Sequence, residues 1–148
     1  MKRAVAILAV LLMAGEATGQ DLRDTGRKRE SAPARDGYRQ LFTRVQEGLS
    51  TGAVDRFSEH MAPQVYINLT GGENGYFSGN QAHYVLAEYL RKRRLVNLKF
   101  STIGETDSTP YATGSATLFV KGTRGIAQVY VSLTRSGEGW NITQLTIY

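Results

Sequence analysis

The chain has 148 residues and no cysteine. Disulfide bonds, zinc sites built on thiolates and lipid anchors attached to cysteine are therefore excluded. Histidine is also scarce, since His60 and His83 are its two instances. Neither is spaced with a second histidine or a carboxylate in the pattern of a metal site, so we predict neither a metal ion nor another cofactor.

Acidic residues are absent from the strands that we predict in the last third of the chain. Four segments there alternate in polarity and are separated by short turns, which is typical of antiparallel strands. They cover residues 95–103, 111–121, 126–134 and 140–148, and none contains Asp or Glu. The carboxylates on which acid–base catalysis commonly depends are thus missing from these strands.

Residues 1–20 have the pattern of a signal peptide. A positively charged start precedes an apolar run over 4–14, which is too short to span a bilayer, and small residues follow at 17–19. An uncleaved anchor and a buried helix are the alternatives. We expect cleavage before Gln20 or Asp21 and a periplasmic or secreted protein. No later stretch is apolar enough for a transmembrane segment.

The formal charge of the chain is +5, which by itself would allow binding to nucleic acid or to an anionic surface. We predict no nucleic-acid binding, because arginine and aromatic residues are not interleaved on one element and an exported protein rarely meets nucleic acid. A solvated basic surface is the simpler interpretation.

Residues 21–37 are polar and nearly without large apolar side chains, so we predict a flexible linker there and one folded domain over 38–148. Apolar stripes at helical spacing predict three helices in the first half of this domain. They cover about 38–50, 53–60 and 80–94. Asn80 is the predicted N-cap of the third. Arg93 lies near the apolar stripe of that helix, so its guanidinium must find a partner or reach solvent.

A hairpin of strand 65–69 and a short partner at 76–78 separates the second and third helices. In the four later strands, one face should pack against the helices. It carries Val96, Leu98, Phe100, Ala112, Gly114, Ala116, Leu118, Val120, Ala127, Val129, Val131, Leu133, Leu145 and Ile147. The other face mixes aromatic, polar and a few aliphatic side chains.

This order of elements resembles the nuclear transport factor 2-like fold, the cystatin-like α+β cone shared with ketosteroid isomerase and scytalone dehydratase. The phrases at 49–57, 76–78, 130–133 and 140–145 are more narrowly similar to the bacterial exported family called domain of unknown function 4783. The resemblance covers 38–148 and rests on packing and turn residues. It implies three N-terminal helices packed on a strongly curved antiparallel sheet of about six strands, and it transfers no catalytic residue.

Binding of a small apolar ligand inside the cone is one function that this fold allows, because small inward side chains can leave a cavity. The alternative is a cone filled by large side chains, among them Phe57, Leu86, Tyr89 and Phe100. The residues that we expect to contact such a ligand are Tyr66, Asn68, His83 and Tyr89.

An isomerase- or dehydratase-like enzyme acting on a small apolar substrate is a further alternative. His83 and Tyr66 are its candidate catalytic residues, since a histidine or tyrosine beside an apolar pocket can transfer a proton. A lone histidine is more often a boundary residue with a satisfied hydrogen bond. The sequence therefore favours a non-enzymatic module that binds a small ligand or a protein.

The outer sheet face would expose a large aromatic patch, which monomers usually avoid. Proteins with this cone often pair through the same face, so the resemblance implies a two-fold homodimer. The residues expected at that contact are Tyr111, Phe119, Tyr130, Trp140 and Ile142. The alternatives are that the linker covers the patch or that it is tolerated at an edge.

Overall fold

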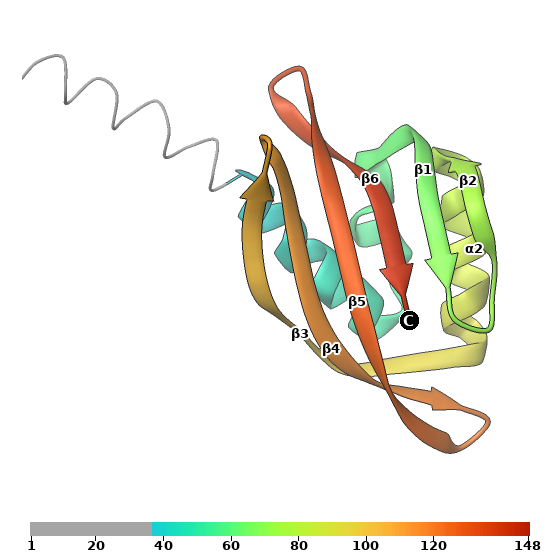
Figure 1. Ribbon diagram of the computed structural model, residues 1–148. Coiled ribbons are helices and arrows are strands. Elements are labelled where there is room, and N and C mark those ends of the chain that lie inside the picture. Colours follow the sequence, from blue (N-terminus) through green and yellow to red (C-terminus); the bar gives the residue numbers. More distant parts are fainter. Residues whose placement is uncertain (1–36) are drawn as a thin grey trace, which may run out of the picture. The chain divides into compact units, whose positions relative to one another are not determined.

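A six-stranded sheet with both of its α-helices on one face makes up residues 37–148, the part of the chain that the computed structural model describes (Figure 1). The predicted signal peptide over 1–20 and the linker up to residue 36 lie outside the described residues. Gly37, which was assigned to the linker, is already helical. The folded domain therefore includes Gly37.

The strands follow the order β2-β1-β6-β5-β4-β3 across the sheet. They are β1 (Met61–Leu69), β2 (Asn74–Ser78), β3 (Arg93–Thr106), β4 (Thr109–Val120), β5 (Thr123–Ser136) and β6 (Gly139–Ile147). All neighbours are antiparallel except β1 and β6, which run parallel. The prediction of a wholly antiparallel sheet is wrong at this pair, because the last strand returns to the centre of the sheet beside the first.

The helical part differs from the prediction in number. In the described residues there are two α-helices, one over 37–51 and α2 (Gly79–Lys92), and two 3-10 turns, η1 (Val54–Arg56) and η2 (Ser58–His60), replace the helix expected over 53–60. The sheet is also not strongly curled, so the expected strongly curved cone is wrong. The structure is instead an α+β fold with helices packed on one face of an open sheet (Figure 1).

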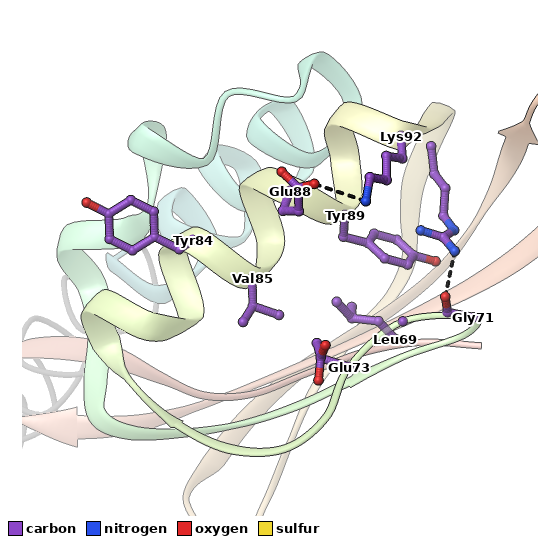
Figure 2. Close-up of a pocket in the computed structure, with 10 residues that line it drawn as sticks. Leu69, Gly71, Glu73, Tyr84, Val85, Glu88, Tyr89 and Lys92 are labelled. Atoms are coloured by element: carbon purple, nitrogen blue, oxygen red, sulfur yellow. Dashed lines mark hydrogen bonds and ion pairs between the residues drawn. The ribbon is translucent and has the colours of Figure 1, made fainter.

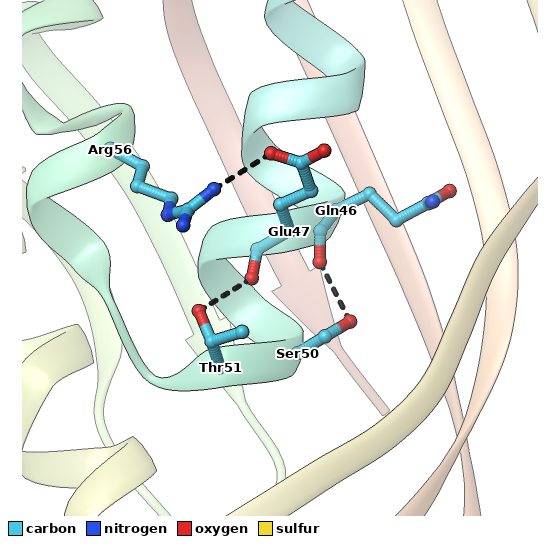
Figure 3. Close-up of polar contacts among 5 residues, drawn as sticks. All are labelled: Gln46, Glu47, Ser50, Thr51 and Arg56. Carbon is cyan, nitrogen blue, oxygen red and sulfur yellow. Dashed lines mark hydrogen bonds and ion pairs between the residues drawn. The ribbon is translucent and has the colours of Figure 1, made fainter.

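The first helix, over 37–51, buries the predicted apolar stripe. Its buried residues are Tyr38, Leu41, Phe42, Val45, Gly48 and Leu49. The hydroxyls of Ser50 and Thr51 donate to the carbonyl oxygens of Gln46 and Glu47, each at 2.7 Å, in the last turn (Figure 3). Gly52 follows at φ +75°, a left-handed conformation that ends the helix and that glycine adopts without strain.

Helix α2 begins with a capping box rather than with the predicted Asn80 cap. The Gln81 N–H donates to Ser78 Oγ at 3.2 Å, and the Ser78 N–H donates to Gln81 Oε1 at 3.1 Å. This reciprocal pair satisfies backbone donors that the first turn leaves without partners. Asn80 therefore lies inside the first turn.

A bulge in β3 shifts which of its residues face the helices. Asn97 has φ 56°, and the pairing of β3 with β4 slips between Val96 and Lys99. Leu95 and Leu98 are consequently both buried, whereas Val96, predicted to face the core, pairs with the outward-facing Thr117. The extra residue of a bulge reverses the side-chain alternation beyond it. The strand also runs further than predicted and includes Glu105.

A register shift in the pairing of β5 with β6, between Ser132 and Leu133, changes the faces of β6. Ile142 pairs with Leu133 and is fully buried in the core. Trp140 is half-buried and packs on Tyr38 of the first helix. Both were predicted to lie on the outer face, and both lie on the helix side instead.

Candidate functional site

The outer face of the sheet is left uncovered by the domain's two α-helices, which both pack on the other face (Figure 1). Pairing registers place its central side chains in two rows that cross all six strands. One row is Gly104, Tyr111, Ser132, Gln144, Tyr66 and Tyr76, and the other is Thr102, Thr113, Tyr130, Thr146, Asn68 and Asn74. We call these positions the tyrosine face. None of them holds a charged residue.

The tyrosines of this face are held by contacts within it. The rings of Tyr111 and Tyr130 are stacked with centroids 6.2 Å apart, and a Cβ added at Gly104 would lie 2.9 Å from the Tyr111 hydroxyl. The Tyr66 ring lies 5.1 Å from that of Tyr76, and the Tyr66 hydroxyl donates to Asn74 Oδ1 at 3.0 Å. The aromatic side chains are thus positioned before any partner binds.

Small polar side chains lie between these rings. Ser132 and Thr146 are the buried polar residues of the domain, with 6% and 8% of their surface exposed. Ser132 Oγ lies 3.3 Å from the Thr143 hydroxyl, and Thr146 accepts a hydrogen bond from the Gln144 amide at 3.5 Å. Every buried polar side-chain atom in the described residues has a partner. The face is therefore uncharged, yet its polar groups are satisfied.

The structure divides the residues predicted at a dimer contact. Tyr111 and Tyr130 belong to the tyrosine face, and Phe119 lies on the same side, nearer the β4–β5 turn, where it pairs with Arg94 and Arg124. Trp140 and Ile142, as described above, face the helices. The sequence correctly placed Ser132, Gln144 and Thr146 on this face with Tyr111 and Tyr130. It did not join Tyr66, Asn68 and Tyr76 to them, because only the long-range pairing of β1 with β6 brings β1 and β2 beside β6.

The residues predicted to contact a ligand are not brought together. Tyr66 and Asn68 belong to the tyrosine face, whereas His83 and Tyr89 are on α2, which packs against the opposite face of β1. His83 Nε2 lies 3.6 Å from the Asp55 carboxylate, which is 91% exposed. Tyr66 and His83 therefore cannot serve one reaction centre in this arrangement, since the sheet separates them.

The space between helices and sheet is filled where a cone cavity was considered. Phe57 and Leu86 are fully buried, and Phe42 contacts Phe100 edge-on at 6.0 Å. Gly114 is small for a different reason from the one predicted. A Cβ there would lie 2.0 Å from the Lys99 carbonyl oxygen, so glycine is required by the close approach of the bulged β3 backbone.

A groove of ≈ 440 Å³ opens beside α2 (Figure 2). Its lining combines a glycine turn, two tyrosines and four charged side chains, namely Leu69, Gly71, Gly72, Glu73, Tyr84, Val85, Glu88, Tyr89, Lys92 and Arg93. The Tyr89 hydroxyl donates to the Thr70 carbonyl at 2.9 Å. Burial raises the pKa of the Tyr89 phenol, and the nearby Arg93 charge opposes this in part. Tyr89 is therefore a neutral hydrogen-bond donor at ordinary pH.

Arg93 finds the partner that its position required. Its guanidinium donates to the Gly71 carbonyl at 2.5 Å and lies 4.6 Å from the centre of the Tyr89 ring (Figure 2). Gly72 has no room for a side chain, because a Cβ would lie 2.8 Å from the same ring. These contacts join the β1–β2 turn to the end of α2. A structural role for the residues of this groove is therefore better supported than ligand binding.

Within residues 37–148 there is no group of three or more histidine, cysteine or acidic side chains that could hold a metal ion. No helix in the same part of the chain is long and apolar enough to cross a membrane.

The sequence from residue 42 to residue 148 matches the family described as a domain of unknown function, DUF4783. The chain belongs to the DUF4783 family. A solved DUF4783 protein from Bacteroides ovatus is 19% identical, with a TM-score of 0.59 over 70% of this chain and 90% of its own. A second, from Bacteroides uniformis, is 13% identical, with a TM-score of 0.60 over 71% and 93% of the two chains. No curated protein matches the chain.

Relatives of the same fold extend beyond the DUF4783 family. A nuclear transport factor 2-like protein with a cystatin-like fold from Novosphingobium aromaticivorans is 16% identical, with a TM-score of 0.62 over 85% of this chain and 88% of its own. At this level of identity the likeness concerns the fold alone. The α+β architecture and the resemblance derived from the sequence are therefore confirmed.

Proposed function

We propose that this DUF4783 protein is an exported, non-enzymatic protein-binding module whose tyrosine face pairs with a second copy of the chain. The observation that carries the proposal is the uncharged face of Tyr66, Tyr76, Tyr111 and Tyr130 across six strands, with both helices on the other side. Protein interfaces are enriched in tyrosine and depleted in charged residues at their centres. Tyr76, with 68% of its surface exposed, would lose the most contact with water on binding.

A second copy is the partner that this surface suits best. The chain carries a formal charge of +5, so two copies repel one another at long range, and the tyrosine face, which holds no charged residue, does not add to this repulsion. A two-fold contact places the same patch on both sides. Six strands spaced ~4.8 Å apart give a width of about 24 Å, which suits the ~800 Å² that each partner buries in a standard interface.

The enzyme alternative has less support from the geometry. It depends on His83 and Tyr66 sharing a pocket, and these side chains lie on opposite sides of β1. A small-ligand function would use the groove beside α2 instead of an interior cavity. That groove is occupied at one end by the Arg93–Gly71 contact, so we rank it below the tyrosine face.

The decisive test is the mass of the protein in solution, measured by light scattering after gel filtration. We expect a dimer, and we expect Tyr111→Ser/Tyr130→Ser to give a soluble monomer with an unchanged circular dichroism spectrum. Tyr84→Ser is the matched control, because Tyr84 is 73% exposed but lies on α2. A wild-type monomer, or a double variant that remains dimeric, would refute the pairing. N-terminal sequencing of protein from its native cells tests export, with Gln20 or Asp21 expected first.

A further inference from the structure

One end of the domain combines basic side chains with an exposed apolar residue. Helix α2 ends there in Arg91 and Lys92, and β3 begins with Arg93 and Arg94. The β4–β5 turn meets this point, because Arg94 pairs with Phe119, which in turn pairs with Arg124. We call this region the basic end, and it comprises Arg91, Lys92, Arg93, Arg94, Lys121, Arg124 and Ile126.

Three of these cations are available to a partner. Arg91 and Lys92 bind the Glu88 carboxylate at 2.7 and 3.1 Å, and Arg93 is held by Gly71 and Tyr89. Arg94, Lys121 and Arg124 make no ion pair within residues 37–148. Arg91, Lys92 and Arg93 directly precede Arg94 in the chain, and Arg94 and Arg124 flank Phe119 on neighbouring strands. Positive charge is therefore concentrated at this end.

The β4–β5 hairpin carries this charge outward. Its turn has Lys121 at φ 51° and Gly122 at φ 79°, which is the geometry of a tight two-residue hairpin turn. The hairpin extends past the rest of the domain (Figure 1). Ile126 follows on β5 with 84% of its surface exposed, and the space around Gly122 and Gly125 is open. An aliphatic side chain so exposed beside cations is suited to an environment that is both apolar and anionic.

We propose that the basic end docks on an anionic lipid surface, with the outer side of the β4–β5 hairpin, which carries Arg124 and Ile126, lying against the headgroup region. The apolar Ile126 side chain would reach the acyl boundary, and Arg94, Lys121 and Arg124 would bind lipid phosphates, which arginine recognises through paired hydrogen bonds. Basic residues next to an apolar anchor are the usual composition of peripheral membrane contacts. A nucleic acid would use the same charges but would leave Ile126 in water.

This proposal does not rest on pairing through the tyrosine face. Arg94, Arg124 and Ile126 face the same side of the sheet but lie beyond the tyrosine face, near the β4–β5 turn. The two can therefore fail separately. Phe119, which borders both surfaces, is left unchanged in every variant below, so that a change in vesicle binding is not caused by loss of the dimer. The mass of each variant in solution is measured alongside as a check.

The test is co-sedimentation of the full-length protein with vesicles of phosphatidylcholine alone and of phosphatidylcholine mixed with phosphatidylglycerol. We expect binding to the mixed vesicles that weakens as salt is raised. Lys121→Gln/Arg124→Gln should lower the affinity roughly 30-fold, since each basic residue near an anionic membrane contributes about a factor of five. Arg39→Gln/Arg135→Gln removes the same charge elsewhere on the domain, and its affinity should change less than about threefold.

Two single variants test the remaining parts of the proposal. Ile126→Ser should weaken binding to the mixed vesicles and increase its sensitivity to salt, because the apolar anchor is lost. Glu88→Gln should strengthen binding, because it releases Arg91 and Lys92 from their shared carboxylate. The stronger vesicle binding expected of Glu88→Gln can be measured whether or not the hairpin variants fold.

Four results would overturn the proposal. These are equal binding to vesicles of phosphatidylcholine alone, unchanged binding by the Lys121→Gln/Arg124→Gln variant, an equal loss in the Arg39→Gln/Arg135→Gln control, and unchanged or weaker binding by Glu88→Gln. Displacement by inorganic phosphate at millimolar concentration would indicate a site for isolated phosphate instead of a lipid surface. Tighter binding to duplex DNA than to vesicles, insensitive to Ile126→Ser, would indicate a nucleic-acid surface.

Discussion

Trp140 of β6 meets Tyr38 of the first helix edge-on, with ring centroids 5.6 Å apart and planes at 90°. Arg135, which pairs with Trp140 across β5 and β6, has its guanidinium 5.4 Å from the centre of the Trp140 ring. A Cβ added at Gly37 would lie 3.7 Å from the same ring. The only tryptophan of the chain therefore reports on the docking of the first helix against the sheet.

Tyr38→Ala should loosen this docking. Tyr38 is 5% exposed and also contacts Phe42 edge-on at 6.1 Å, so the loss of its ring should cost about 3–5 kcal/mol of unfolding free energy. Trp140 should become more exposed, and its fluorescence emission should move to longer wavelength. Tyr84→Ala is the control and should change the unfolding free energy by less than ~0.5 kcal/mol. Unchanged emission in Tyr38→Ala would show that the helix is held without this contact.

The local periodicity of the sequence was enough to predict most elements and their faces, but not the faces of the bulged strands β3 and β6. The stripe of Tyr38, Leu41, Phe42, Val45 and Leu49 is buried as expected, because a helix repeats its apolar positions within one continuous segment. The faces of Val96, Trp140 and Ile142 were predicted wrongly, because a bulge within β3 and another within β6 reverse the alternation along each strand. A bulge depends on the partner strand and leaves only a weak local signal.

The candidate site was harder to predict than the fold for a related reason. Tyr111 and Tyr130 could be placed on one face, since their strands are consecutive in the chain. Tyr66 joins them only because β6 pairs in parallel with β1, a contact between residues far apart in sequence. Arg93 is the opposite case. It is the first residue of β3 and not part of the last turn of the third helix, as predicted, yet its charge needed a partner as expected, because it lies beside buried apolar residues.

The bulge in β3 also yields a stability prediction at Gly114. The methyl group of Gly114→Ala would lie 2.0 Å from the Lys99 carbonyl oxygen and 2.8 Å from the Phe100 Cα. Backbone atoms in a paired strand cannot move away cheaply, so we expect the unfolding free energy to fall by about 1–3 kcal/mol or more. Urea denaturation measures this. Gly125→Ala, which meets no atom within 4 Å, should stay within ~0.5 kcal/mol of the wild type, and equal losses in the two variants would contradict the argument.

The start of α2 offers a direct comparison between the predicted and the observed cap. Ser78→Ala removes the side-chain acceptor of the capping box and should lower the unfolding free energy by ~1 kcal/mol. Asn80→Ala should have little effect or stabilise slightly, because alanine has the higher helix propensity. Thermal unfolding of both variants decides between the caps. A larger loss of unfolding free energy in Asn80→Ala than in Ser78→Ala would show that Asn80 is the N-cap, as predicted from the sequence.

Tyr89 predicts how stability depends on alkaline pH. Burial raises the pKa of its phenol in the folded protein above the unfolded value of about 10. Below that unfolded value the phenol is neutral in both states and its full contribution is present. As pH rises through the unfolded and then the folded pKa, the unfolded chain releases its proton first, so the stability from Tyr89 is progressively lost.

Tyr89→Phe separates this effect from that of the other tyrosines. At pH 8 the variant should be less stable by ~1 kcal/mol, because the hydrogen bond to the Thr70 carbonyl is removed. Between about pH 9.5 and pH 11 its stability should fall less steeply than that of the wild type, since one proton-linked term is absent. Urea denaturation across this range is the measurement, with Tyr84→Phe as the exposed control. Parallel pH curves for the wild type and Tyr89→Phe would mean that the Tyr89 phenol titrates alike in the folded and unfolded chains.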